Sequence, residues 1–154
     1  MASALIVYAS LTGNNELIAN HINERLEAAG YDTDVQEISQ AVAEDFLDVD
    51  LCVVASYTYS GVTDGELPDE ALDFYDELQE LELPEQVFGV AGSGDTAYER
   101  FCTAVEMFTA AFKGTGATQG AASVKIDLEP EEEDLANLDA FTDSLIAAVA
   151  AKGK

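Results

Sequence analysis

The stretch Ser10-Leu11-Thr12-Gly13-Asn14-Asn15 decides the fold that we expect for this chain. It follows an apolar run at residues 4–9 and opens a segment with helical spacing, which predicts a buried strand that turns sharply into a helix. The helix dipole and the free N–H groups of a first helical turn attract an anion, and hydroxyls with a glycine let a phosphate approach closely. A simple capped turn between a strand and a helix has the same pattern, so both interpretations stay open at this point.

Strands and helices alternate along the rest of the chain. The expected strands lie at 4–9, 31–38, 51–56, 87–91 and 122–128. The expected helices lie at about 15–29, 69–81, 99–113 and 130–151, with at most a short helix at 42–47. The pattern predicts one α/β domain over residues 1–154, a doubly wound three-layer sandwich with a five-stranded parallel sheet.

The helical segments carry three more specific expectations. Helical spacing predicts that the buried stripe of the first helix consists of Leu17, Ile18, Ile22 and Leu26. His21, the only histidine, is expected on the surface of that helix. Pro130 is expected in the first turn of the last helix, where its missing N–H costs nothing.

The net charge of −25 is the most informative bulk property, with 6 Lys and Arg against 31 Asp and Glu. It argues against binding to nucleic acid or to anionic membranes, because both are polyanions. It favours a partner with a basic face, while a solvated acidic surface adapted to high salt is the open alternative. No apolar run approaches the roughly 20 residues that span a bilayer, and no signal-peptide pattern opens the chain. We therefore expect a cytoplasmic protein.

Three polar segments follow the first, third and fourth expected strands. Besides the opening stretch they are 57–68 and 92–98, both rich in hydroxyls, glycine and aromatic residues. In a doubly wound sheet, such segments meet at the carboxyl edge of the strands, where ligands bind. The first segment has neither the Lys of a triphosphate-binding loop nor a GxGxxG motif, so a single terminal phosphate fits it. Tyr59 and Tyr98 come from different segments and can sandwich a flat ring system.

Other kinds of site fit the sequence less well. A phospho-acceptor receiver domain needs acidic residues after strand one, Asp after strand three and Lys at the end of strand five. This chain has Ser10 and Ser56 at the first two places, and Lys125 lies inside the fifth strand, so that class is excluded. Cys52 and Cys102 form no CxxC motif and are expected to be reduced, and no metal site is expected.

These residues resemble flavodoxin, of the short-chain kind. The opening stretch resembles the family's T/S-x-T-G-x-T phosphate loop, residues 56–68 its second loop and residues 92–102 its third. The similarity covers the whole chain, with no long insertion in the fifth strand. The resemblance implies the strand order 2-1-3-4-5, one non-covalently bound FMN, and a low-potential one-electron carrier that transforms no substrate by itself.

The resemblance also assigns roles to individual residues. Tyr59 would cover one face of the isoalloxazine ring and Tyr98 the other. Asp95 and Cys102 would meet its pyrimidine edge through backbone N–H groups, with Arg100 near it. The phosphate would be held by Ser10, Thr12, Gly13, Asn14 and Asn15. The full set expected to bind FMN is Ser10, Leu11, Thr12, Gly13, Asn14, Asn15, Ser56, Tyr57, Thr58, Tyr59, Ser60, Gly61, Ser93, Gly94, Asp95, Tyr98, Phe101 and Cys102.

Three residues bear on how the family pattern applies here. Asn15 stands where the family usually has Thr, and its amide can still donate to phosphate. Ser60 stands where the family often has Gly, at a peptide that turns toward flavin N5 on reduction. Because that turn needs a positive φ, we expect the one-electron-reduced flavin to be less stable here than in Gly-containing relatives. Arg100 either pairs with Glu99 or Glu106 on a helix surface or softens the negative field at the flavin.

The acidity gives the expected function a mechanism. Carboxylates around a ring held out of water disfavour the negative charge that full reduction adds, which makes the second reduction harder. The same acidic rim would dock basic flavodoxin or ferredoxin reductases and acceptor oxidoreductases, less tightly in salt, and we expect a monomer. One alternative is a dedicated FMN-containing activator or regulator of one client enzyme. A flavin domain of a quinone or thiol reductase is a third interpretation, but the sequence has no second nucleotide motif.

Overall fold

The computed structural model describes residues 2–9, 13–56, 71–94, 103–127 and 130–153. Its strands are β1 (Ser3–Ala9), β2 (Asp32–Glu37), β3 (Leu51–Ser56), β4 (Val87–Gly94), β5 (Thr118–Gln119) and β6 (Val124–Asp127). All their pairings are parallel. Every residue of β3 is buried, as expected for an apolar strand that is covered on both faces.

The strand order is β2-β1-β3-β4-β5, and β6 also pairs with β4. β5 pairs with the start of β4 and β6 with its end, so both occupy the fifth position and the predicted order 2-1-3-4-5 is confirmed. β6 lies within the predicted fifth strand at 122–128, but the short strand β5 that precedes it was not predicted, so the fifth position is divided. The N–H of Gly120 still donates to the carbonyl of Phe88, but its own carbonyl accepts the Ser144 hydroxyl of the last helix at 2.7 Å.

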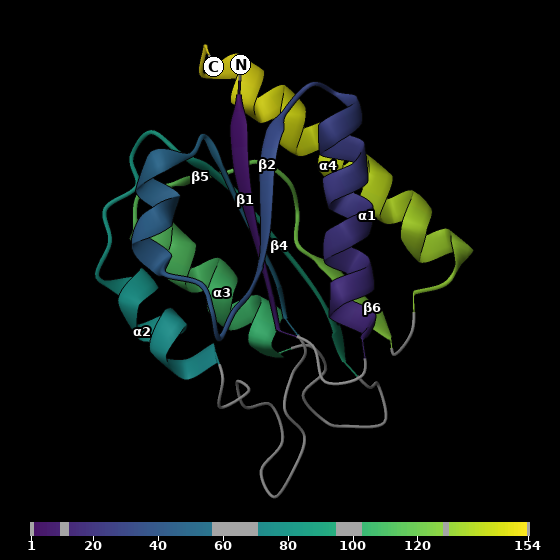
Figure 1. The fold of residues 1–154 in the computed structure, drawn as a ribbon, viewed down its shortest axis with the longest axis horizontal. Coiled ribbons are helices and arrows are strands. Elements are labelled where there is room, and N and C mark those ends of the chain that lie inside the picture. The colour runs from purple at the N-terminus through teal and green to yellow at the C-terminus, as the bar shows by residue number, and fades with distance from the viewer. Residues whose placement is uncertain (1, 10–12, 57–70, 95–102, 128–129, 154) are drawn as a thin grey trace, which may run out of the picture.

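Helices cover both faces of the sheet, which confirms the three-layer sandwich (Figure 1). One layer contains α1 (Asn14–Ala28) and α4 (Glu132–Ala151). The other contains α2 (Leu72–Gln79), α3 (Thr103–Gly114) and the short 3-10 helix η1 (Ala43–Asp48). The predicted starts of the second and third helices, at 69 and 99, lie outside the described residues. Within the described ranges, no helix has the length and apolarity needed to cross a membrane.

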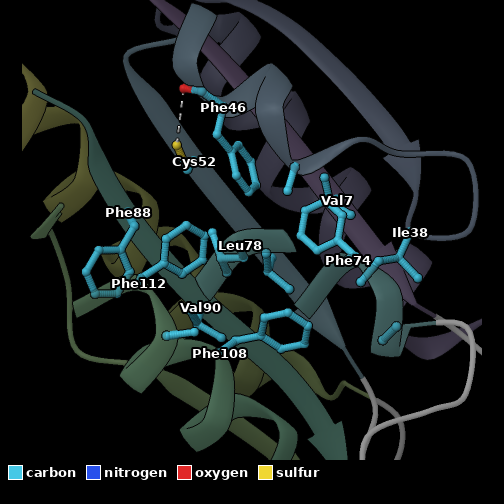
Figure 2. Packing of buried hydrophobic residues seen from close by; sticks show 14 of the residues in the cluster. Val7, Ile38, Phe46, Cys52, Phe74, Leu78, Phe88, Val90, Phe108 and Phe112 are labelled. Carbon is cyan, nitrogen blue, oxygen red and sulfur yellow. Dashed lines mark hydrogen bonds between the residues drawn. The ribbon is translucent and has the colours of Figure 1, made fainter. Parts of the chain in front are cut away.

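An aromatic cluster fills the layer between the sheet and α2, α3 and η1 (Figure 2). Phe112 of α3 stacks on Phe88 of β4 at 4.8 Å between ring centroids. Phe46 of η1 meets Phe74 of α2 edge-on at 5.6 Å. Burial of such side chains contributes roughly 1.5–3 kcal/mol each, so this cluster fixes the helices of this layer on the sheet.

The opposite layer is built on a stripe of α1 that differs from the prediction. The buried residues of α1 are Asn15, Ile18, Ala19, Ile22 and Leu26. Leu17 is 50% exposed, so its expected place in the core is wrong: a side chain one position away from the stripe points about 100° away from it. The His21 side chain is only 26% exposed, because it packs toward α4 and lies 2.8 Å from a carboxylate oxygen of Asp139.

Two element ends also differ from the prediction. Residues 92–94 belong to β4 instead of the expected loop, because Gly92, Ser93 and Gly94 pair in register with β6. Pro130 lies outside α4, so its expected place in the first helical turn is wrong. Glu131 precedes that helix, and the Asp134 carboxylate accepts its N–H at 3.0 Å, which places the helix start after the proline.

Candidate functional site

The carboxyl ends of β1, β3 and β4 meet at one edge of the sheet, where the sequence predicted a ligand site. Ala9 pairs with Ser56, the last residue of β3. The described pairing of β3 with β4 ends at Ala55 and Ala91, after which β4 continues to Gly94. Helix α1 begins at this edge, within the predicted phosphate-binding stretch 10–15 (Figure 1).

The start of α1 has the geometry that an anion site needs. Gly13 precedes the helix with φ +93°, a left-handed conformation that other residues rarely adopt. The first helical hydrogen bond runs from the Leu17 N–H to the Gly13 carbonyl at 3.0 Å. The N–H groups between them have no intrahelical acceptor, and Gly13 has no side chain with which to cap them. Asn14, the first residue of the helix, is half-exposed beside them.

Asn15 and Ser93 are joined by two hydrogen bonds across the interior. The Asn15 amide nitrogen donates to the Ser93 hydroxyl at 2.8 Å, and the Ser93 backbone N–H donates to the Asn15 amide oxygen at 3.1 Å. Their exposed fractions are only 1% and 5%. Burial of an amide is costly unless its polar atoms are paired, and each residue here supplies the partner of the other.

The strand ends approach each other closely at Gly92. A Cβ built on this glycine would overlap the backbone carbonyl oxygen of Ser56 and would lie 2.8 Å from a methyl carbon of Val105. The α-hydrogen of glycine is therefore what allows β4 to pass the end of β3. Two of the expected site segments, those after β3 and β4, begin at this contact.

The carboxylate of Glu16 lies in the first turn of α1, at the same helix start. The Tyr8 hydroxyl donates to the Glu16 carboxylate at 3.0 Å. Burial raises the pKa of the Tyr8 hydroxyl above its usual value, and the hydrogen bond to Glu16 and the negative charges of Glu16 and Glu37 raise it further. Tyr8 is therefore a neutral hydrogen-bond donor at physiological pH, at the end of a strand that leads into the site.

The structure describes six of the residues expected to bind FMN, and it places all six at this edge: Gly13, Asn14, Asn15, Ser56, Ser93 and Gly94. The others lie outside the described residues and their roles stay predictions: Ser10, Leu11, Thr12, Tyr57, Thr58, Tyr59, Ser60, Gly61, Asp95, Tyr98, Phe101 and Cys102. Arg100 also lies outside them. The pairing of Asn15 with Ser93 was missed. A polar residue in register with the apolar stripe at 18, 22 and 26 was the available signal.

Other parts of the described structure offer weaker candidates. No group of three or more His, Cys, Asp or Glu side chains in these ranges could hold a metal ion. Cavities of about 450 and 400 Å³ flank residues 121–125, one against α4 and one against α3. Cys52 is fully buried, and burial raises the pKa of its thiol well above the usual value, which makes it unreactive.

Comparison with known proteins identifies the family. The flavodoxin family model matches residues 6–138. This chain belongs to the flavodoxin family. Its relatives include two probable flavodoxins of Bacillus subtilis: flavodoxin 1, 37% identical over 96% of this chain and 92% of its own, and flavodoxin 2, 40% identical over 89% and 91%. A solved flavodoxin of Streptococcus pneumoniae superposes with a TM-score of 0.92 at 48% identity, over 96% of this chain and 99% of its own.

Membership in this family settles the general role. Flavodoxins of the short-chain kind are FMN-containing electron carriers and not enzymes, and the chain is therefore one of these carriers. The described residues fit the cofactor. A helix start preceded by a glycine at positive φ suits the terminal phosphate, and Gly92 lets the end of β3 and β4 approach each other closely.

Proposed function

We propose that this flavodoxin is a low-potential carrier that shuttles single electrons between a basic-faced reductase and acceptor oxidoreductases. It would work as a monomeric single domain in the cytoplasm. The observation that carries the proposal is the net charge of −25. Such a surface steers oppositely charged partners into encounter and repels copies of itself.

The FMN phosphate would bind at residues 10–15 and the ring between Tyr59 and Tyr98. Bound FMN supplies the one-electron chemistry, and the chain supplies binding, orientation and exclusion of water. The helix start at Asn14 and the positive φ of Gly13 support the placement of the phosphate, because they present N–H groups without adding a cation. A triphosphate-binding loop would carry a Lys for the β- and γ-phosphates, and the stretch 10–15 contains none.

The low potential follows from the charges around the site. Full reduction adds negative charge to the ring, and carboxylates at the same edge of the sheet, such as Glu16, would make that addition less favourable. Two of the described cations are held in ion pairs: Arg25 donates to Asp143 at 2.8 Å, and Lys125 lies 2.6 Å from Glu106. Each of these two cations therefore neutralises a carboxylate on a helix.

The docking surface would lie where α1 and α2 begin. Each helix start carries an exposed leucine next to a carboxylate, Leu17 beside Glu16 and Leu72 beside Asp73. The two leucines are 50% and 45% exposed. Exposed apolar side chains rimmed by charge are typical of surfaces that bind other proteins transiently. Both helices start at the edge that carries the site (Figure 1).

A charge-matched pair of variants tests this surface. Asp73→Asn with Asp76→Asn removes two exposed charges of α2, and Glu82→Gln with Glu85→Gln removes two at the opposite edge, before β4. We expect the first variant to slow reduction by an NADPH-dependent flavodoxin reductase by about threefold at low salt, and the second to change it little. Equal slowing by both, or no loss of rate in salt, would contradict the docking surface. Binding to one client enzyme with no reduction by a general reductase would favour the activator alternative.

A further inference from the structure

We propose that Asn15 and Ser93 form a link between the two halves of the FMN site, so that the Asn15 side chain acts by positioning the segment after β4 and not by contacting the phosphate. The inference rests on the proposed site. It assigns to Asn15 a role different from that of the Thr that the family usually has at this position. Asn15 would then be a positioning residue, and the loss of its side chain would change the environment of the flavin ring.

The first observation is the geometry of the pair. The hydrogen bonds at 2.8 and 3.1 Å use the only acceptor of the Asn15 amide and one of its two donor hydrogens. Both go to one residue, which fixes the orientation of the amide. The second hydrogen bond reaches the backbone of Ser93, so that Asn15 holds the strand itself and not only a side chain.

The second observation is the place of the pair in the chain. Asn15 is the last residue of the predicted phosphate-binding stretch 10–15, and Ser93 lies near the start of the third expected site segment, residues 92–102. The described β3–β4 pairing ends at Ala91, so Ser93 lies beyond it, and Asn15 accepts its N–H there. The pair therefore joins two expected site segments through residues that are 78 positions apart in the sequence.

The third observation is the burial of the pair. Asn15 is 1% exposed and continues the stripe of Ile18 and Ile22 against the sheet. Its neighbour Asn14 is partly exposed at the helix start, in contrast to the buried Asn15. A buried amide in an apolar stripe lowers the stability of the fold unless its polar atoms are hydrogen-bonded. The hydrogen bonds to Ser93 are therefore what allows Asn15 to be buried at this position.

Binding of FMN and of riboflavin, which lacks the phosphate, separates positioning from phosphate contact. We expect Asn15→Ala to raise the Kd of both flavins by about tenfold, which leaves the ratio of the two unchanged. We also expect it to shift the visible absorption spectrum of bound FMN, because the ring environment changes. Ser93→Ala keeps the backbone N–H and should give a smaller effect of the same kind. The double variant should bind no more than about twofold more weakly than Asn15→Ala.

A matched control separates a specific effect on flavin binding from a general loss of stability. Thr142 of α4 is fully buried, and its hydroxyl donates to the Leu138 carbonyl at 2.8 Å. Thr142→Ala should lower the stability of the apoprotein and leave both Kd values and the spectrum unchanged. If Asn15→Ala does not fold, the Ser93→Ala variant carries the same comparison of the two flavins.

Two results would overturn the inference. One is a variant that weakens FMN while riboflavin binding and the spectrum stay as in the original protein, which would make Asn15 a phosphate ligand. The other is additive effects of the two substitutions, which would make them independent. Failure of the unmodified protein to bind either flavin would instead contradict the proposed site itself.

Discussion

The substitution Gly92→Ala tests most sharply how the strand ends build the site. A Cβ at this position would overlap the backbone carbonyl oxygen of Ser56 and would also lie closer than 3.0 Å to Val105 of α3. A carbonyl in a strand cannot rotate away as a side chain can. The added methyl group must therefore push the ends of β3 and β4 apart, or push α3 off the sheet.

Overpacking of this kind costs about 1–3 kcal/mol of unfolding free energy. For a chain of this length, that corresponds to a fall in Tm of roughly 2–12 °C. Gly89 offers an intermediate case, because a Cβ there would meet side-chain atoms of Phe141 and Leu145 at 2.8 Å, which can give way. We expect the loss of stability to be larger for Gly92→Ala than for Gly89→Ala.

Gly114→Ala is the matched control. Nothing lies within 4 Å of a Cβ at Gly114 and its φ is not positive, so the substitution should be neutral or should stabilise by about 0.4–1 kcal/mol. Urea unfolding of the three apoproteins gives the order, and titration of the same apoproteins with FMN should show weakened binding for Gly92→Ala alone. Equal stabilities of the Gly92 and Gly114 variants would refute the tight contact between the strand ends.

Three further predictions concern the body of the fold. In a Cys102→Ser variant, the buried Cys52 thiol, whose pKa is raised by burial, should react with a thiol reagent at pH 8 only after unfolding, and rapid labelling of the native protein would contradict this. Arg25 lowers the pKa of the exposed Asp143 carboxyl, so its stabilisation is present above the unfolded-state pKa and is lost as the pH falls through the folded-state value. The difference in unfolding free energy between the original protein and Arg25→Gln should therefore be small at pH 7 and should disappear in acid, as the pH falls below the usual range of a carboxyl pKa, whereas a difference that widens in acid would be the wrong sign. Phe112→Ala should cost about 3–5 kcal/mol in urea unfolding, and a loss under 1 kcal/mol would show that its stacking on β4 is unimportant.

Periodicity in the sequence predicted most of the fold, because burial on two faces leaves a strong signal. The strand β3 is an unbroken apolar run, and it was placed correctly. The run 92–94 was taken for a loop because glycine and serine are turn residues. Pairing with β6, which no local pattern reveals, holds it in the sheet. The division of the fifth strand position was not predicted for a similar reason. The Gly120 carbonyl accepts a hydrogen bond from Ser144, which lies on a helix that is distant in sequence.

The candidate site was predictable where single residues carry the chemistry. Gly13 at the helix start has the positive φ that its place in the motif requires. The link between Asn15 and Ser93 was not predictable, because an amide at this position can equally face a ligand. Only the approach of α1 to β4 shows which partner its polar atoms have. Leu17 was misplaced for the same reason, since Asn15 takes the buried position that spacing alone gave to an apolar residue.

Titration of the apoprotein with FMN, followed by stepwise reduction of the complex, tests the central claim most directly. We predict that flavin fluorescence is quenched until one FMN is bound per chain and that riboflavin binds more weakly. We also predict that the complex then takes up two electrons in separate steps, the second at a clearly lower potential. A protein that leaves FMN fluorescence unchanged, or a complex that takes up both electrons at one potential, would contradict the assignment of this chain as a low-potential one-electron carrier.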